Sequence, residues 1–452
     1  MTNFAAMLRD KEIRRRLMLT FGMLFCYRVG FMVPLPGVNF VEASRMQDAG
    51  GDFSGLFSLM SMLTGGALNQ ATLFSLGVMP YISASIIFSL LTKMVPSMER
   101  LAKEGAAGQR KINQYTRLAT IPICLLQSFF VIFGVLSAER GASLLYPGVR
   151  DWWLLYILVV MIALTAGTLF IMWLGEQIQE HGIGNGISLI IMAGIVADLP
   201  AALQQAIAAG SQAGTGTEAY QTLLMFVAAW ILVVVAVVII TKAQRRIPIQ
   251  QAKQTRGRRV YGGQRHFLPI KLNFAGVMPI IFASALLVIP VFIGGLIGWN
   301  WLRDSFQSGR GFWYVSCYIA LIFFFSFFWA SLMLQPAEIA NNLKEHGAFI
   351  PGIRPGKNTA EFLEGTMVRI TLAGAAFLAF LAVLPNLVNT QLKGLHQNLI
   401  YFMSGTSILI VVGVALDTVE KVNAMLIMRN YDGFMKEGSG TGTAAGWGRQ
   451  AR

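Results

Sequence analysis

Charged residues are scarce in this chain. Only 13% of its 452 residues are charged, against roughly 25% in an average soluble domain. Hydrophobic residues make up 55% of the sequence, and many of them lie in long runs. This composition excludes a soluble globule and indicates an integral membrane protein. The formal net charge of +14 is compatible with nucleic acid, anionic lipid or an acidic partner, so the positions of the charges must decide.

Cysteine is nearly absent as well. The three cysteines, Cys26, Cys124 and Cys317, all fall inside apolar segments. They form neither a disulfide framework nor a metal-ligand spacing, so we interpret them as small buried hydrophobes. We interpret Glu176, Glu180 and His181 as solvated loop charges rather than metal ligands. The sequence therefore predicts no metal site and no cofactor.

Catalytic patterns are also missing. The glycine-rich HGIGNG at 181–186 has no preceding strand, which argues against a dinucleotide-binding loop. No nucleophile–base pairing stands out, so we expect no catalytic residues and no enzymatic activity. Arg28, Lys93 and Arg369 lie within or beside apolar spans and are expected to snorkel to an interface. They do not form the chain of buried carboxylates typical of an ion-coupled transporter.

Long apolar segments, rather than alternating strands, predict an all-α polytopic membrane protein. We expect the basic start to precede a retained first span, not a cleaved signal peptide. The ten expected spans are 17–36, 71–94, 118–138, 152–174, 183–199, 222–241, 274–297, 312–334, 368–388 and 402–419.

Lysine and arginine are distributed unevenly among the connecting segments. When the segments are assigned alternately to the two sides of the membrane, one side has 27 lysines and arginines and the other has six. The positive-inside rule therefore predicts that both termini are cytoplasmic. It places the 1–16 arm, the loops 242–273 and 335–367, and the 420–452 tail in the cytoplasm. The 200–221 segment becomes an external hinge.

Two spans share a sequence. Residues 77–87 read GVMPYISASII and residues 276–286 read GVMPIIFASAL, at a constant offset of 199. The expected topology makes the two copies antiparallel. This predicts inverted halves, 17–199 and 222–419, around a pseudo-two-fold axis in the membrane plane, although chance similarity within an apolar alphabet is an alternative.

The stretch from Phe53 to Leu91 is unusual. Its first apolar piece, Gly55 to Leu63, is too short to cross a bilayer, and Gly65-Gly66 separates it from a full span. A half-length helix before a full span suggests a re-entrant element that lines or closes a cavity.

Two further features each allow two interpretations. Isoleucines recur at i, i+4 spacing, as in Ile82 with Ile86 and Ile187 with Ile191. They could contact lipid or the core, or they could form an apolar neck that gates by dewetting. The 242–273 loop carries nine basic residues and predicts a hairpin or short strands. Its charge could serve only as a topology signal, or it could form a contact surface for a polyanionic partner.

Several motifs together resemble the SecY family of protein-conducting channels. They extend over nearly the whole chain in family order. They are PLPGV (34–38), LGVMPYISASII (76–87), QYTRLATI (114–121), GIGNGISLIIMAGIV (182–196), QRRIP (244–248), LPIKLNFAGVMPIIFAS (268–284), FIPGIRPGKNTAEFL (349–363) and GTSILIVVGVALD (405–417).

The resemblance implies a ten-helix channel in the plasma (inner) membrane, with two pseudo-symmetric halves, a central pore and a plug helix at 55–67. Such a channel passes unfolded secretory polypeptides and releases transmembrane segments laterally into lipid. The implied pore ring consists of Ile82, Ile86, Ile187, Ile191, Met278, Ile281 and Ile410. The implied plug residues are Gly55, Leu56, Phe57, Leu59, Met60, Met62, Leu63, Gly65 and Gly66.

The resemblance also implies a lateral gate and docking loops. The lateral-gate residues are Ser85, Ser89, Thr92, Gln127 and Ser284. The partner-docking residues are Arg245, Arg246, Arg256, Arg258, Arg259 and Arg354. The implied partners are the SecE and SecG subunits, the SecA motor ATPase, the translating ribosome, signal sequences, nascent polypeptides and membrane lipid. Two rival classes are a secondary transporter, which needs buried ionisable groups, and a scaffold or insertase without a pore.

Overall fold

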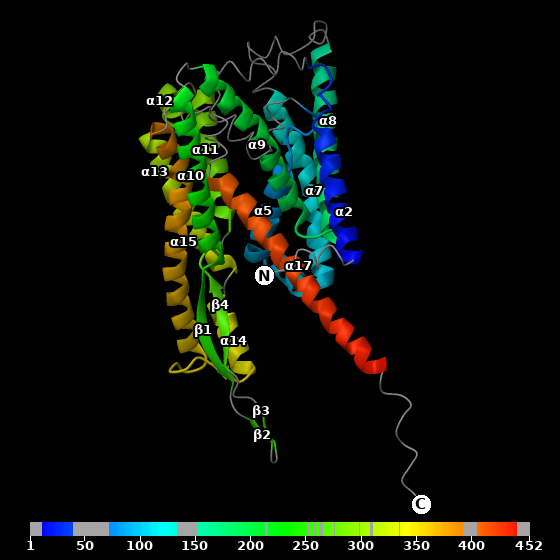
Figure 1. Cartoon of the computed structure of the whole chain (residues 1–452), viewed down its shortest axis with the longest axis vertical. Helices are drawn as coiled ribbons and strands as arrows, with labels where there is room; N and C mark the ends of the chain where they lie inside the picture. The colour runs from blue at the N-terminus through cyan, green and yellow to red at the C-terminus, as the bar shows by residue number, and fades with distance from the viewer. Residues whose placement is uncertain are drawn as a thin grey trace, which may run out of the picture.

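The computed structural model describes residues 11–38, 72–132, 152–212, 216–251, 254–256, 259–261, 265–274, 276–297, 299–307, 311–333, 335–391 and 405–440. Within these ranges the chain is a bundle of long helices, with a small β-sheet at one end (Figure 1). The predicted plug, 55–67, lies outside the described residues.

The helices and strands follow one another in a simple order. The first half of the chain forms α2 (Lys11–Gly30), α5 (Met79–Met94), α6 (Pro96–Lys103), α7 (Ala106–Val131), α8 (Trp153–His181) and α9 (Gly186–Gln212). The second half forms α10 (Gly216–Lys242), α11 (Met278–Ile297), α12 (Asn300–Gln307), α13 (Phe312–Met333), α14 (Pro336–Glu345), α15 (Lys357–Gln391) and α17 (Gly405–Gly440). The strands are β1 (Gln244–Gln251), β2 (Gln254–Arg256), β3 (Arg259–Tyr261), β4 (Arg265–Lys271) and β5 (Ala348–Phe349).

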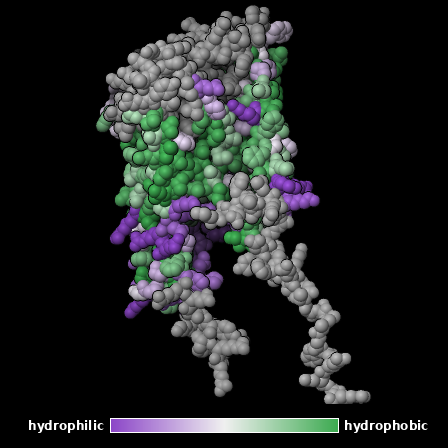
Figure 2. Space-filling view, in the orientation of Figure 1, coloured by the Kyte–Doolittle hydropathy of each residue, from purple (hydrophilic) through white to green (hydrophobic). Residues whose placement is uncertain are grey.

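The outer surface is strongly apolar. Leu154, Phe21 and Phe25 are 85%, 65% and 71% exposed, an exposure that a water-soluble protein does not tolerate over a wide area. Figure 2 shows a hydrophobic band across the described helices and hydrophilic residues around the sheet. Within the part of the chain that the structure describes, three helical segments are long and apolar enough to cross a membrane: Trp153–His181, Phe312–Glu345 and Lys357–Leu384. Met79–Thr92 and Pro96–Lys103, bent by 96°, could form a fourth crossing. The count of ten spans stays a prediction.

Several helices extend beyond the expected spans. Helix α2 begins at Lys11, inside the expected 1–16 arm, and α7 begins at Ala106. Most of the expected hinge is helical, because α9 continues to Gln212 and α10 starts at Gly216. The reason is that hydropathy marks the thickness of the apolar layer. A helix whose backbone bonds are already satisfied can continue into water through alanine and glutamine, which are good helix formers.

The repeated GVMP sequence adopts the same local structure twice. Gly77 and Gly276 have φ angles of 54° and 64°, a left-handed conformation that favours glycine. Two residues later the helices α5 and α11 begin, at Met79 and Met278, each with proline in the second helical position. The two copies of the repeat, 199 residues apart, therefore share both their sequence and their local structure at these helix starts. Duplication of the complete halves stays a prediction.

Each half has its own apolar core. One cluster, formed by α2, α8, α9 and the start of α5, includes Tyr27, Phe74 and Ile190. A second cluster, formed by α10, α11, α13, α15 and α17, includes Ile280 and Leu378. The halves meet where α9 packs against α10 and α17. In the described part of the chain, neither α5 nor α7 packs comparably against α11 or α13.

Candidate functional site

The predicted ring residues lie on helices of both halves, and none is among the exposed large hydrophobics. Ile86, Ile281 and Ile410 are 7%, 8% and 6% exposed. The other members, Ile82, Ile187, Ile191 and Met278, are half-buried. The four helices that carry the ring are α5, α9, α11 and α17.

Each of these helices also has an opposite, exposed face. Ile87 on α5, Val196 on α9 and Leu286 on α11 are exposed. Each follows a predicted ring residue by five positions, which is about 140° around a helix of 3.6 residues per turn. On α17, Val419 is 50% exposed and Ile410 is buried. The ring residues therefore occupy the faces turned away from the apolar surface.

Three ring residues share one set of neighbours. Ile82, Ile187 and Ile191 pack against the apolar cluster of the first half, and Val414 of α17 joins the same cluster. Helix α17 belongs to the second half of the chain, so side chains from both halves converge at this level.

Two glycines set the distance between α8 and α9. A Cβ atom at Gly186 would lie 1.8 Å from the backbone oxygen of Gly175, and one at Gly175 would lie 2.9 Å from Cγ1 of Ile187. Small residues allow this close approach of two membrane helices. The contact fixes Ile187 beside α8.

The predicted gate residues lie on α5, α7 and α11. Three of their hydroxyl groups bond within their own helices: Ser89 donates to the Ser85 carbonyl at 2.7 Å, and Ser284 donates to the Ile281 carbonyl at 2.9 Å. Thr92 donates in the same way to the Ser89 carbonyl. Gln127 is half-buried on α7. These hydroxyls are already satisfied, so they can face lipid or a passing chain at little cost.

The two cytoplasmic loops of the prediction form one body. Strand β1 pairs antiparallel with β4 of the same loop and with β5 of the 335–367 loop, which gives the order β4-β1-β5. Ile247, Ile270 and Ile350 from the sheet region pack with Leu363 of α15. The predicted hairpin is confirmed. Its pairing with the second loop was not predicted, because no sequence pattern specifies a two-residue β5.

The arginines lie on the outside of this body. Ile247 and Ile249 of β1 are buried, whereas Arg245 and Arg246 are exposed. Arg354 is also exposed, and its backbone carbonyl accepts a 2.8 Å hydrogen bond from Thr359 Oγ1. Arg256 lies in β2 and Arg259 in β3, a separate two-stranded hairpin. Arg258 lies outside the described residues.

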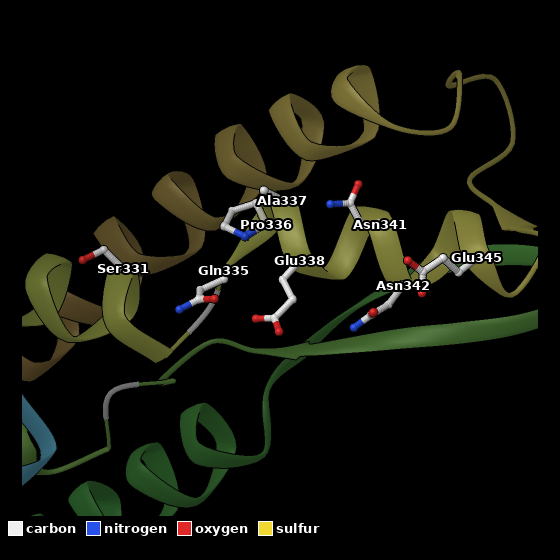
Figure 3. A pocket seen from close by; sticks show the side chains of 8 residues that line it. All are labelled: Ser331, Gln335, Pro336, Ala337, Glu338, Asn341, Asn342 and Glu345. Carbon is white, nitrogen blue, oxygen red and sulfur yellow. The ribbon is translucent and has the colours of Figure 1, made fainter. Parts of the chain in front are cut away.

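An open polar cleft of about 610 Å³ lies along α14. Figure 3 shows it beside the strands of the sheet. Its polar lining includes Gln335, Glu338, Asn341, Asn342 and Glu345. The cleft places carboxylates and amides next to the arginine-bearing strands.

Two expectations are wrong. Cys26 is not a buried hydrophobe, because it is exposed on α2. Glu176 is not a solvated loop charge: it lies inside α8, its side chain is 17% exposed, and Oε1 lies 2.5 Å from Arg117 Nε on α7. Sequence reasoning missed the pair because its members are far apart in the chain. Among the described residues, no group of three or more His, Cys, Asp or Glu could hold a metal ion.

These features define a polytopic α-helical membrane protein with two helical units that meet through α9, α10 and α17. The SecY family model matches residues 72–419, and the chain belongs to the SecY family. The protein translocase subunit SecY of Streptomyces galbus is 42% identical, with 96% of this chain and 100% of that protein covered.

Solved structures support the same fold. One solved structure is of a SecY protein whose plug domain is described as stabilising the closed state of the translocation channel. It matches with a TM-score of 0.58 at 18% identity, and the match covers 92% of this chain and 93% of that chain. Sec61 in a canine ribosome-channel complex has a TM-score of 0.52 at 17% identity, with coverages of 92% and 93%. The all-α channel-type fold predicted from the sequence is thereby confirmed.

Proposed function

We propose that this chain is the pore-forming subunit of a protein translocation channel in the plasma membrane. It passes unfolded secretory polypeptides across the bilayer and releases transmembrane segments sideways into lipid. Membership of the SecY family supports this proposal, since the curated relative described above is named a protein translocase subunit. The observation that supports it most is that the seven residues of the expected ring are buried or half-buried on α5, α9, α11 and α17.

The ring explains how such a channel stays closed to ions. A narrow neck lined by isoleucine expels water, and an ion cannot cross without its hydration shell. The side chains are flexible and hold no polar bonds, so a polypeptide can push them apart. Met278 keeps the neck apolar and adds an unbranched, adaptable side chain. In this proposal residues 55–67 form the plug on the external side.

The weak contact between α5–α7 and α11–α13 suits a lateral exit. The halves pack on the other side, through α9 with α10 and α17. Opening can therefore occur by a hinge movement at α9–α10 that costs little buried area at the gate. Ser85, Ser89, Thr92, Gln127 and Ser284 line this gate. An apolar signal sequence or transmembrane segment leaves through it into lipid.

The arginine-bearing sheet is the docking surface for cytoplasmic partners. Arg245, Arg246 and Arg354 project from a rigid body, which favours binding of acidic protein surfaces or ribosomal RNA. The SecA motor or a translating ribosome supplies the energy, and the channel itself is not an enzyme. SecE and SecG complete the complex. Both termini lie in the cytoplasm, on the same side as the sheet.

The test of this proposal is the seal at the ring. The complex is purified from native membrane, reconstituted into vesicles, and assayed for ion leak and for translocation of a secretory substrate. Ile82→Ser places a hydroxyl group in the neck and should raise the ion leak, because the neck then holds water. Ile87→Ser, on the exposed face of the same helix, is the matched control and should leave the leak unchanged.

Equal leaks in the two variants would refute the ring. Failure of the wild-type complex to carry any polypeptide into the vesicles would refute the translocation function itself.

A further inference from the structure

The ion pair between Arg117 and Glu176 joins two helices of the first half. Arg117 lies on α7 and Glu176 on α8, with 2.5 Å between Nε and Oε1. The side chains are 46% and 17% exposed, so the carboxylate is largely withdrawn from solvent. An ion pair at this degree of burial is screened much less than a surface pair.

The pair lies beside the helix that carries Ile82. Tyr81, the residue before Ile82 on α5, is within electrostatic range of both Glu176 and Arg117. Helix α5 packs extensively on α7, and α7 packs on α8. Glu180, one turn further along α8, adds a second negative charge near Glu176.

The other side of the pair leads to the helix that carries Ile187. Gly175 precedes Glu176 and is in close contact with both Gly186 and Ile187 of α9. The ion pair therefore lies next to two ring residues by different routes. It is close in space to Tyr81, the neighbour of Ile82 on α5. Glu176 also follows Gly175, which contacts Ile187 of α9. These two helices carry all four ring residues of the first half.

We infer that Arg117 and Glu176 are positioning residues for the pore ring: their ion pair holds α7 against α8 and thereby fixes where Ile82 and Ile187 stand relative to each other. This inference rests on the proposed function. Removal of the Arg117 charge leaves the Glu176 carboxylate poorly solvated and next to Glu180. The α7–α8 contact then has to open to hydrate that carboxylate. The neck widens as a consequence.

The experiment uses the reconstituted native complex. Four variants are compared with wild type: Arg117→Gln, Glu176→Gln, the double Gln variant, and the exchange Arg117→Glu with Glu176→Arg. Asp417→Asn is the matched control, because it breaks a 2.8 Å pair with Lys421 between two exposed side chains of one helix, α17. Ion leak and translocation of a substrate with a shortened apolar signal are measured, together with thermal stability in detergent.

Arg117→Gln should raise the ion leak by about fivefold, a change of the size that interaction energies between contacting residues produce. It should also admit the substrate with the weakened signal. The exchange variant should return both readouts toward wild type, whereas Asp417→Asn should change neither. A purely structural role would lower thermal stability without admitting the weakened substrate, and would overturn the inference. So would an unchanged leak in Arg117→Gln and Glu176→Gln while the wild-type complex translocates normally, a result that leaves the proposed function standing.

Discussion

The close approach of α8 and α9 predicts a large effect for a small substitution, Gly186→Ala. The added Cβ would lie 1.8 Å from the Gly175 backbone oxygen and 2.9 Å from Cβ of Ile178. An ordinary contact is at least 3.4 Å, so α8 and α9 must separate by roughly 1.6 Å. Neither neighbour is the end of a flexible side chain. Overpacking of this kind costs about 1–3 kcal/mol.

The displacement also moves the ring. Ile187 is the residue after Gly186, and it contacts Gly175 through Cγ1. Gly186→Ala should therefore destabilise the complex and raise ion leak together. Thermal unfolding in detergent and vesicle leak measure the two effects.

Gly365→Ala provides the matched control for this substitution. No atom lies within 4 Å of a Cβ atom at position 365, inside helix α15. Alanine should there stabilise the helix by up to about 1 kcal/mol. If Gly186→Ala unfolds at the same temperature as Gly365→Ala, or higher, the close approach of α8 and α9 is not what holds this interface.

Two further substitutions test the body that contains β1, β4 and β5. Thr359→Val removes the hydroxyl that donates to the Arg354 carbonyl at 2.8 Å and should lower the free energy of unfolding by about 1 kcal/mol. Thr359→Ser should keep this hydrogen bond and the stability that it provides. Equal denaturation curves for the two variants would contradict the role of the bond. Arg354→Glu should weaken binding of the cytoplasmic motor by about tenfold, because it reverses one exposed docking charge, whereas Arg354→Lys should bind nearly as wild type. A motor that binds Arg354→Glu as tightly as wild type in a vesicle-binding assay would remove Arg354 from the docking surface.

Much of the fold was accessible from the sequence, because a membrane imposes strong rules. Apolar runs predicted α13 closely, and they predicted that helices lie at α8 and α15, both of which extend well beyond the expected spans. Helix ends were predicted less well. The apolar stretch of α17 ends near Leu416, but the helix continues to Gly440, since hydropathy does not report where backbone hydrogen bonding stops.

The candidate site divides in the same way. The isoleucine spacing identified residues that share a helix face, and the pattern of the basic loop predicted a hairpin or short strands. Sequence could not show that β5 of another loop joins β1, because that pairing depends on two backbones meeting in space. It also misassigned Glu176, because an ion partner 59 positions away leaves no local signature.

The sequence by itself determined the class of protein, the periodic faces of its helices and its family, because these depend on composition and local order along one chain. Only the tertiary structure decided which faces meet: Gly175 against Gly186, Arg117 against Glu176, and α9 against α10 and α17. These contacts join residues distant in the chain, and their energies depend on distances of a few ångströms that no local pattern encodes.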